Sequence, residues 1–315
     1  SVRQNKLKIA IVGCGAMGSI YAALFSDSGH DVFAIDTNVA HVNAINEYGL
    51  KVIGASGDRT IRLAAFTKAP QIKVDLVIVA VKATYLDSAV PALRTLIDSE
   101  SILVTIQNGL GGAEKLARII KHHNFLIGVA QGFGASMKEP GLVHHSDMKS
   151  IRIGRLQHII SDGTQERLLN DVTKIWKQAG FEAYAEQDIR SVQWEKLICN
   201  VAYSSVCALT GMTLGEVLRD EHISSISRAA AIEAWEVARA QNISLSFDDP
   251  IKEIQDFGER MPNAKPSVLL DIEAGRPSEI QFISGAVPEE AKKVGKSAPV
   301  NSTLTGLVKS LENSR

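Results

Sequence analysis

The strongest constraint on the fold of this chain lies near its start, where a glycine-rich turn joins an apolar run to a helical pattern. Residues 8–12 (KIAIV) favour a strand, residues 13–18 read GCGAMG, and residues 17–28 carry apolar side chains at helical spacing. In such a turn the first glycine permits the tight bend, the second lets a phosphate approach the backbone, and the third lets helix and strand pack closely. Unpaired N–H groups at the helix start favour an anion there.

This unit therefore predicts a dinucleotide site, the alternative being a glycine-rich turn without a ligand. The residues assigned to the cofactor in the turn are Gly13, Cys14, Gly15, Ala16, Met17 and Gly18. Asp36 closes the second expected strand about 20 residues later, where a carboxylate accepts hydrogen bonds from the adenosine ribose. A carboxylate there favours NAD, because it would repel the 2′-phosphate of NADP. The alternative is that Asp36 only caps the next helix, through Thr37 and Asn38.

Short β-rich runs alternate with amphipathic segments from residue 7 to residue 186, which predicts a parallel sheet of the α/β class. Residues 77–81 form a continuous apolar run, as expected for a central strand covered on both faces. Residues 142–155 are expected to add late strands or a hairpin to the sheet edge. The expected strands are 7–12, 31–35, 74–81, 102–106 and 125–130, and the expected helices are 17–28, 40–48, 86–97 and 113–121.

The pattern changes near residue 188, after which long helical patterns dominate. Residues 189–209 and 223–240 favour long helices, residues 303–311 a terminal helix, and the turn-rich stretch 248–266 a short one. We therefore expect a Rossmann-like, doubly wound dinucleotide-binding domain at 1–187. A mostly α-helical domain that binds the substrate and carries the catalytic residues is expected at 188–315.

Composition points to a small-molecule partner. The net charge is −1 and 45% of the residues are hydrophobic, so the chain has no basic field for a nucleic acid or an anionic membrane but ample material for two cores. No stretch reaches the ~18 apolar residues of a membrane span, and the polar first residues lack the pattern of a signal peptide. A cytoplasmic protein is expected.

No metal site is expected. Cys14, Cys199 and Cys207 are dispersed, without the spacing of a zinc site or a disulfide framework. The pairs at 122–123 and 144–145 are adjacent histidines, whose side chains would point to opposite faces of a strand. We interpret both pairs as surface histidines.

A polar stripe marks the first long helix of the second domain. Lys196, Asn200 and Ser204 follow one another at one-turn intervals on a segment that is otherwise rich in apolar residues. Polar groups aligned in this way suit the wall of a polar site better than a packed core. A buried lysine with a lowered pKa could protonate the oxygen of a ketone that receives a hydride. The alternative for Lys196 is an ordinary solvated helix lysine.

From about residue 7 to its end, the chain resembles the ketopantoate reductase (2-dehydropantoate 2-reductase) family. This family lies within the superfamily whose C-terminal domain is similar to that of 6-phosphogluconate dehydrogenase. The resemblance rests on the glycine turn and on four later motifs in the same order. These motifs are Val81-Lys82-Ala83, Gln107-Asn108-Gly109-Leu110-Gly111, Trp194-Glu195-Lys196-Leu197 with Asn200, and Pro266-Ser267 followed by Asp271-Ile272-Glu273 and Glu279-Ile280.

The resemblance implies reduction of the 2-keto group of ketopantoate to pantoate by hydride transfer from NADPH, a step of pantothenate and coenzyme A synthesis. Lys196 would protonate the carbonyl oxygen, and Asn200 would orient that lysine or the substrate oxygen. Asn108 would face the nicotinamide and the substrate, and Lys82 would line the cofactor site. Ser267 and Glu279 would grip the polar ends of the substrate, unless Ser267 only caps a helix and Glu279 is a surface carboxylate.

Two positions depart from the family pattern. Ser204 stands where many members have asparagine, so the substrate stays open, with Ser204 still assigned to substrate binding. Asp36 stands where NADPH-using members commonly have a basic residue, so the resemblance implies NADP while Asp36 favours NAD. The alternative function is an NAD-dependent dehydrogenase for a D-2-hydroxy acid such as mandelate, and a more remote one is a non-catalytic dinucleotide sensor. A homodimer through the second domain is compatible with the sequence.

Overall fold

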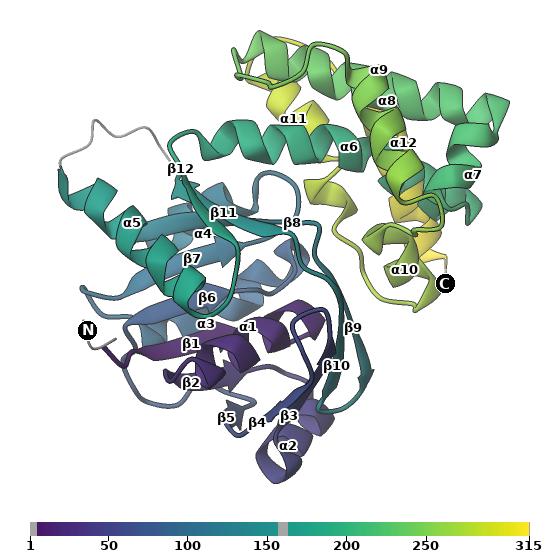
Figure 1. Cartoon of the computed structure of the whole chain (residues 1–315). Helices are drawn as coiled ribbons and strands as arrows, with labels where there is room; N and C mark the ends of the chain where they lie inside the picture. Colours follow the sequence, from purple (N-terminus) through teal and green to yellow (C-terminus); the bar gives the residue numbers. More distant parts are fainter. Residues whose placement is uncertain (1–4, 157–162, 315) are drawn as a thin grey trace. The chain divides into compact units, whose positions relative to one another are not determined.

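The chain divides into two compact units in the computed structural model, which describes residues 5–156 and 163–314 (Figure 1). The first unit comprises Ser1–Gln107 and Ala113–Ile189, and the second comprises Asn108–Gly112 and Arg190–Arg315. The short segment Asn108–Gly112 therefore groups with the helical unit although it follows a strand of the first. Among the described residues, no helix is long and apolar enough to cross a membrane.

A doubly wound sheet organises the first unit. Within the described residues, eight strands follow the order β12-β11-β8-β7-β6-β1-β2-β5, all parallel except for the antiparallel pair β8–β11. The predicted α/β class, with a Rossmann-like first part and a helical second part, is confirmed. The strands are β1 (Lys8–Val12), β2 (Asp31–Ile35), β5 (Ala64–Phe66), β6 (Leu76–Val79), β7 (Ile102–Ile106), β8 (Phe125–Gln131), β11 (Ser150–Arg155) and β12 (Ala183–Glu186).

Helices cover both faces of this sheet, and the alternation of β1 shows why. Ile9 and Ile11 belong to the main core of the unit, whereas Ala10 and Val12 are equally buried on the opposite face. In Figure 1, α1 and α5 lie on the near side of the sheet and α3 and α4 behind it. The helices are α1 (Ala16–Asp27), α2 (Val39–Tyr48), η1 (Ala83–Tyr85), α3 (Leu86–Leu96), α4 (Gly112–Ile120) and α5 (Gly163–Gln178).

A second, four-stranded sheet was not expected. It runs β4-β3-β10-β9, formed by Arg59–Ile61, Leu50–Gly54, Leu142–Asp147 and Gly134–Glu139, and helix α1 contacts strands of both sheets. The expectation that residues 142–155 extend the edge of the main sheet is therefore wrong in its first half. β10 pairs in parallel with β3 in the small sheet, and only β11 joins the main sheet. β10 also pairs with the preceding strand β9 in an antiparallel hairpin, but its parallel partner β3 lies far away in sequence, so no local pattern predicts that it joins the small sheet.

One histidine assigned to the surface is buried. His145 in β10 has no exposed area, its ring packs on Phe133, and its Nδ1 lies 3.0 Å from Ser56 Oγ. Burial lowers the pKa of His145, which favours the neutral ring. The strand alternation places His144 on the other, partly exposed face.

The second unit is a bundle of helices around a separate core. The long helix α6 (Ile189–Thr210) supplies Trp194, Leu197 and Ile198 to this core, and α8 (Glu221–Ala240) supplies alanines that allow close packing. The remaining elements are α7 (Leu214–Arg219), α9 (Pro250–Arg260), α10 (Ser267–Glu273), η2 (Ile280–Phe282), α11 (Ala286–Lys292) and α12 (Pro299–Asn313). The helices expected at 189–209, 223–240 and 303–311 all appear, and α9 falls within the turn-rich stretch 248–266.

Candidate functional site

The glycine-rich turn has the geometry of a phosphate-binding loop. Gly13 has φ +96°, and a Cβ there would overlap the backbone of Val81, which follows β6. A Cβ on Gly18 would overlap the carbonyl oxygen of Gly13, so the third glycine permits the close approach of helix and turn. At Gly15, by contrast, a Cβ would meet nothing within 4 Å. The backbone is therefore open at the one position where a pyrophosphate must approach it, and the turn fits a dinucleotide.

The Asp36 side chain binds the backbone of the glycine turn. Its Oδ2 accepts a hydrogen bond of 2.8 Å from the Cys14 N–H, and its Oδ1 accepts one of 2.8 Å from the Asn38 N–H. The cap of α2 is Asn38, whose side chain accepts from the His41 N–H at 3.1 Å, so the interpretation of Asp36 as the helix cap is wrong. The Cys14 N–H is already committed to Asp36, which leaves the N–H groups at the start of α1 for an anion.

A buried relay supports the same turn from behind, and sequence reasoning missed it. The Gly141 N–H donates to His41 Nδ1 at 2.9 Å, so His41 Nε2 carries the proton and donates to Ser19 Oγ at 3.0 Å. Ser19 Oγ in turn donates to the Cys14 carbonyl oxygen at 3.0 Å. Ser19 and His41 have no exposed area. Burial lowers the pKa of His41, in keeping with a neutral ring.

Hydrogen bonds link the carboxyl ends of β6 and β7 beside the glycine turn. Gln107 Nε2 donates to the Val79 carbonyl oxygen at 2.9 Å and to that of Val81 at 3.2 Å. Lys82 is partly buried between the end of β6 and η1, at the carboxyl edge where ligands of open α/β sheets bind. Its assignment to the cofactor stays a prediction. The resemblance pointed to the motif that contains Gln107 but not to this structural role.

The candidate reactive group of the second unit is a lysine that donates a hydrogen bond to an asparagine. Lys196 lies on α6, and its Nζ donates to Asn108 Oδ1 at 2.9 Å. Burial lowers the pKa of Lys196 to about 8, while the Glu279 carboxylate partly opposes this shift. The interpretation of Lys196 as a solvated helix lysine is therefore wrong. An ammonium with this pKa keeps its proton at neutral pH and can release it in a reaction.

Two glycines explain how Asn108 reaches the lysine. Gly109 has φ +80°, and a Cβ there would overlap the carbonyl oxygen of Phe282. The neighbouring Leu110 N–H donates to that same carbonyl oxygen at 2.8 Å, and Gly111 also has a positive φ. The segment Asn108–Gly112 is therefore fastened to η2, which directly follows Glu279. This contact between two backbone segments therefore helps to position Asn108, whose side chain accepts the hydrogen bond from the Lys196 ammonium.

The remaining predicted residues differ in burial. Glu279 is 6% exposed, so it is not a surface carboxylate. Ser204 is buried, whereas Asn200 is partly buried and makes no side-chain hydrogen bond with other described residues. Ser267 is exposed as the first residue of α10, and the cap position belongs to Pro266, so Ser267 is not the helix cap. Asn108 rather than Asn200 holds the lysine.

The turn between α10 and Glu279 is closed by an ion pair. Arg276 Nε lies 3.2 Å from Asp271 Oδ1, and the Arg276 N–H donates to the Asp271 carbonyl oxygen at 2.8 Å. Gly275 supplies the positive φ that this turn requires. These bonds fix how the chain returns toward Glu279 after α10.

Metal ligands and reactive thiols do not mark this site. In residues 5–156 and 163–314, no group of three or more His, Cys, Asp or Glu side chains is arranged to hold a metal ion. All three cysteines are buried and unpaired, and burial raises the pKa of Cys199 and Cys207 to about 12. These thiols are therefore poor nucleophiles at neutral pH.

Two family profiles match this chain. The profile described as Ketopantoate reductase PanE/ApbA matches residues 9–158, and that of its C-terminal part matches residues 188–312. The 2-dehydropantoate 2-reductase of Pyrococcus abyssi is 30% identical over 308 residues, covering 97% of this chain and 98% of the relative. That of Pyrococcus horikoshii is 30% identical over 307 residues, covering 98% of both chains.

Solved structures show the same fold over the full length. A PanE/ApbA family ketopantoate reductase from Ralstonia eutropha JMP134 has a TM-score of 0.86 at 28% identity, covering 98% of this chain and 99% of that one. A D-mandelate dehydrogenase with NADH and anilino(oxo)acetate has a TM-score of 0.88 at 25% identity, covering 98% of each chain. The glycine turn, the Lys196 group and these matches agree: the chain belongs to the ketopantoate reductase PanE/ApbA family and is an NAD(P)-dependent oxidoreductase.

Proposed function

We propose that this enzyme reduces the keto group of a small 2-oxo acid, with ketopantoate as substrate and pantoate as product. The observation that carries the proposal is the Lys196 ammonium, held by Asn108 Oδ1 at 2.9 Å and kept by burial at a pKa of about 8. Such a group can neutralise the charge that develops on a ketone oxygen during reduction. The similarity to two enzymes named 2-dehydropantoate 2-reductase supports ketopantoate in particular.

In this mechanism Lys196 acts as the general acid. A nicotinamide cofactor, when held by the glycine turn and Asp36, would supply the hydride for the carbonyl carbon. Lys196 gives one proton to the carbonyl oxygen as the C=O bond becomes a C–O single bond, and the resulting amine regains a proton from water. Asn108 accepts a second ammonium hydrogen and so fixes the direction of Nζ.

The other polar residues of the second unit are assigned to substrate binding. Glu279 is buried and raises the pKa of Lys196, so it stabilises the charged lysine before the reaction. By resemblance it would also accept a hydrogen bond from the substrate hydroxyl, which ketopantoate has. Asn200 and Ser204 follow Lys196 along α6 and would orient the substrate oxygens, with Ser267 gripping the other polar end.

We further propose that NADH is preferred over NADPH. Asp36 already binds two backbone N–H groups of the turn and of the following loop, which keeps its carboxylate at the end of β2. A ribose with a free 2′-hydroxyl can donate to the remaining lone pairs of this carboxylate, whereas a 2′-phosphate would be repelled. The solved D-mandelate dehydrogenase with NADH, similar over 98% of this chain, supports the same choice.

A second candidate is a dehydrogenase for another D-2-hydroxy acid. It is favoured by the TM-score of 0.88 to D-mandelate dehydrogenase and by Ser204, which is shorter than the asparagine of many family members. This candidate uses the same Lys196 chemistry and differs only in the side chain of the substrate.

One assay separates these functions. The loss of NADH or NADPH absorbance is followed with ketopantoate, phenylglyoxylate and 2-oxoisocaproate at equal concentrations. The proposal expects the highest kcat/KM with ketopantoate and NADH. Turnover of phenylglyoxylate or 2-oxoisocaproate alone would replace ketopantoate by the second candidate, and a higher kcat/KM with NADPH would overturn the role of Asp36. Binding of the cofactor without turnover of any acid would indicate a sensor instead.

A further inference from the structure

A pocket of about 440 Å³ lies within the helical unit and is not part of the Lys196 group. Helices α7, α8 and α9 line it, and Lys196, Asn108 and Glu279 are not among its lining residues. Pockets of this size suit small organic molecules. The proposed reaction assigns no role to it.

The floor of this pocket is buried and combines an apolar side chain, two glycines and serine hydroxyls. Ile254 and Gly258 of α9 and Gly215 of α7 line it and have little exposed area. Ser227 of α8 is 2% exposed, and its Oγ has no hydrogen-bond partner among the described residues. A buried hydroxyl without a partner costs about 1–3 kcal/mol, so its retention at the cavity suggests a partner that binds there.

Two arginines stand on the rim. Arg219 of α7 and Arg228 of α8 line the pocket and are exposed, and neither has an ion pair or a hydrogen bond with the other described residues. The lining contains one carboxylate, Glu259, whose Oε1 accepts from Gln255 Nε2 at 3.0 Å. The rim therefore has an excess of one positive charge, carried by guanidinium groups that are free to bind an anion.

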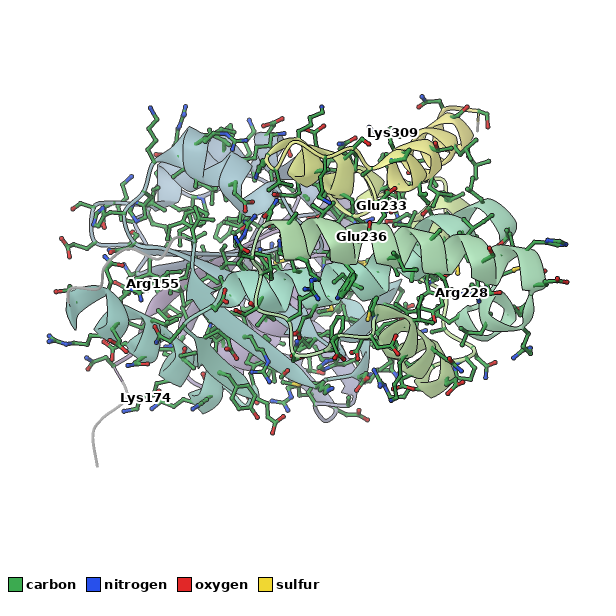
Figure 2. All side chains as sticks on the ribbon, turned by 90° about the horizontal axis from the view of Figure 1, so that it is seen from above. Arg155, Lys174, Arg228, Glu233, Glu236 and Lys309 are labelled. Carbon is green, nitrogen blue, oxygen red and sulfur yellow. The ribbon has the colours of Figure 1, made fainter. Side chains whose placement is uncertain are left out.

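Glu233, farther along α8, is engaged with another helix. Glu233 binds the N–H groups of Val300 and Asn301 at the start of α12, at 2.9 and 2.8 Å. Figure 2 labels Arg228 toward one end of α8, with Glu233 and Glu236 farther along the same helix.

We propose that this pocket binds a small organic anion, with a carboxylate or phosphate head on the two guanidinium groups and a short apolar tail over Ile254. Arg219, Arg228 and the Ser227 hydroxyl, three donors without a partner in the described part of the chain, border one cavity whose floor includes Ile254. The hydroxyl can rotate toward an oxygen of the ligand, which removes the cost of its burial. The site is separate from the proposed reaction and does not depend on it.

Calorimetry on the full chain tests the site with three probes: 4-bromobutyrate, 3-bromopropyl phosphate and the uncharged 4-bromobutan-1-ol. The proposal expects one or both anions to bind more tightly than the alcohol, and their ranking tells which head the site prefers. The double variant Arg219→Met/Arg228→Met should lose this affinity by at least about tenfold. Arg239→Met on α8 is the control, because Arg239 packs on Trp235 and does not line the pocket.

Ser227→Ala separates a binding role from a structural one. Removing a buried hydroxyl without a partner should leave the thermal midpoint unchanged or raise it, yet it should weaken anion binding several-fold. An anomalous bromine peak in crystals soaked with 4-bromobutyrate should lie between α7, α8 and α9. Equal binding of the alcohol, unchanged affinity in the double variant, or bromine peaks only elsewhere would overturn the site. So would a change of oligomeric state in the double variant without a change in affinity, since it would make the rim an interface between two copies.

Discussion

The glycine turn of the first unit and the Lys196 group of the second are built in opposite ways. The turn is contiguous in sequence, its shape is set by glycines at 13 and 18, and the groups that it offers to an anion are backbone N–H donors at the start of α1. The Lys196 group gathers Asn108, Lys196 and Glu279 from three distant segments, and its chemistry lies in side chains. A site built from backbone groups should be disturbed by a substitution that adds a side chain. A site built from side chains should be disturbed by a substitution that removes a functional group. The five predictions below use this difference.

The largest effect is expected from Lys196→Ala. The general acid is lost, so kcat should fall by about 10²–10⁴, while the Kd of the cofactor should stay within about twofold. The measurement is steady-state turnover beside fluorescence titration with NADH. Lys252→Ala serves as a matched control, because Lys252 is an exposed lysine of the same unit paired with Asp256. A variant that retains most of its turnover would remove Lys196 from the mechanism.

Alanine at the second and third glycines of the turn tests the backbone-built site. Gly18→Ala would place a Cβ on the Gly13 carbonyl oxygen, so it should destabilise the protein by about 1–3 kcal/mol as well as weaken cofactor binding. Gly15→Ala meets no neighbour, so its thermal midpoint should not change while the Kd of NADH rises by at least about tenfold. Gly306→Ala in α12, also open, is the control for an ordinary helical glycine. If Gly15→Ala bound NADH normally, the pyrophosphate would have to lie elsewhere.

The same contrast explains what the sequence could predict. The strand, turn and helix around GCGAMG follow from local patterns, and β2 and β7 fall at their expected residues. The hydrogen bond from Lys196 to Asn108 depends on Gly109 packing on Phe282, a contact across much of the chain that no spacing reveals. Burial of Glu279 and the relay through His41 likewise depend on tertiary neighbours. The polar stripe on its helix singled out Lys196, but its neighbours Asn108 and Glu279 could be assigned only through the family resemblance.

Asn108 gives a sharper test of the side-chain site than Lys196 itself. Asn108→Ala removes the acceptor of the ammonium, so kcat should fall by about tenfold to a hundredfold, the cost of a hydrogen bond to a charged group. Asn108→Asp keeps an acceptor and adds a negative charge, which should restore part of the rate and raise the pKa of Lys196. Rates across pH distinguish positioning from folding. Equal losses with no difference in pH profile would indicate that Asn108 only supports the backbone.

The pH profile should report the pKa of Lys196. The acid form is required for reduction, so kcat/KM should fall as the pH rises through about 8. Glu279→Gln removes the carboxylate that raises this pKa, and the decline should then begin at a lower pH. Glu273→Gln is the control, since Glu273, the last residue of α10, pairs with the exposed Lys265 and not with Lys196. An unchanged profile in Glu279→Gln would separate Glu279 from the lysine.

The smallest expected effect is a loss of stability at acidic pH that is confined to the first unit. Burial lowers the pKa of His30 and His41, and in both the Nδ1 accepts a backbone N–H, from Leu7 at 3.1 Å and from Gly141 at 2.9 Å. Because the unfolded chain takes up protons at a higher pH than the folded one, the stability present above about pH 6.5 should decrease as the pH falls below it.

Hydrogen exchange measures this loss for each unit separately. Between about pH 7.5 and about pH 5.5, opening of β1 and α1 should become easier than opening of α6 and α8 once intrinsic exchange rates are corrected. His41→Asn keeps an acceptor for the Gly141 N–H but cannot take up a proton, so it should reduce the loss. Each kcal/mol lost would lower the thermal midpoint by about 2–4 °C. Equal acid sensitivity of both units would mean that His30 and His41 do not set the acid sensitivity of the first unit.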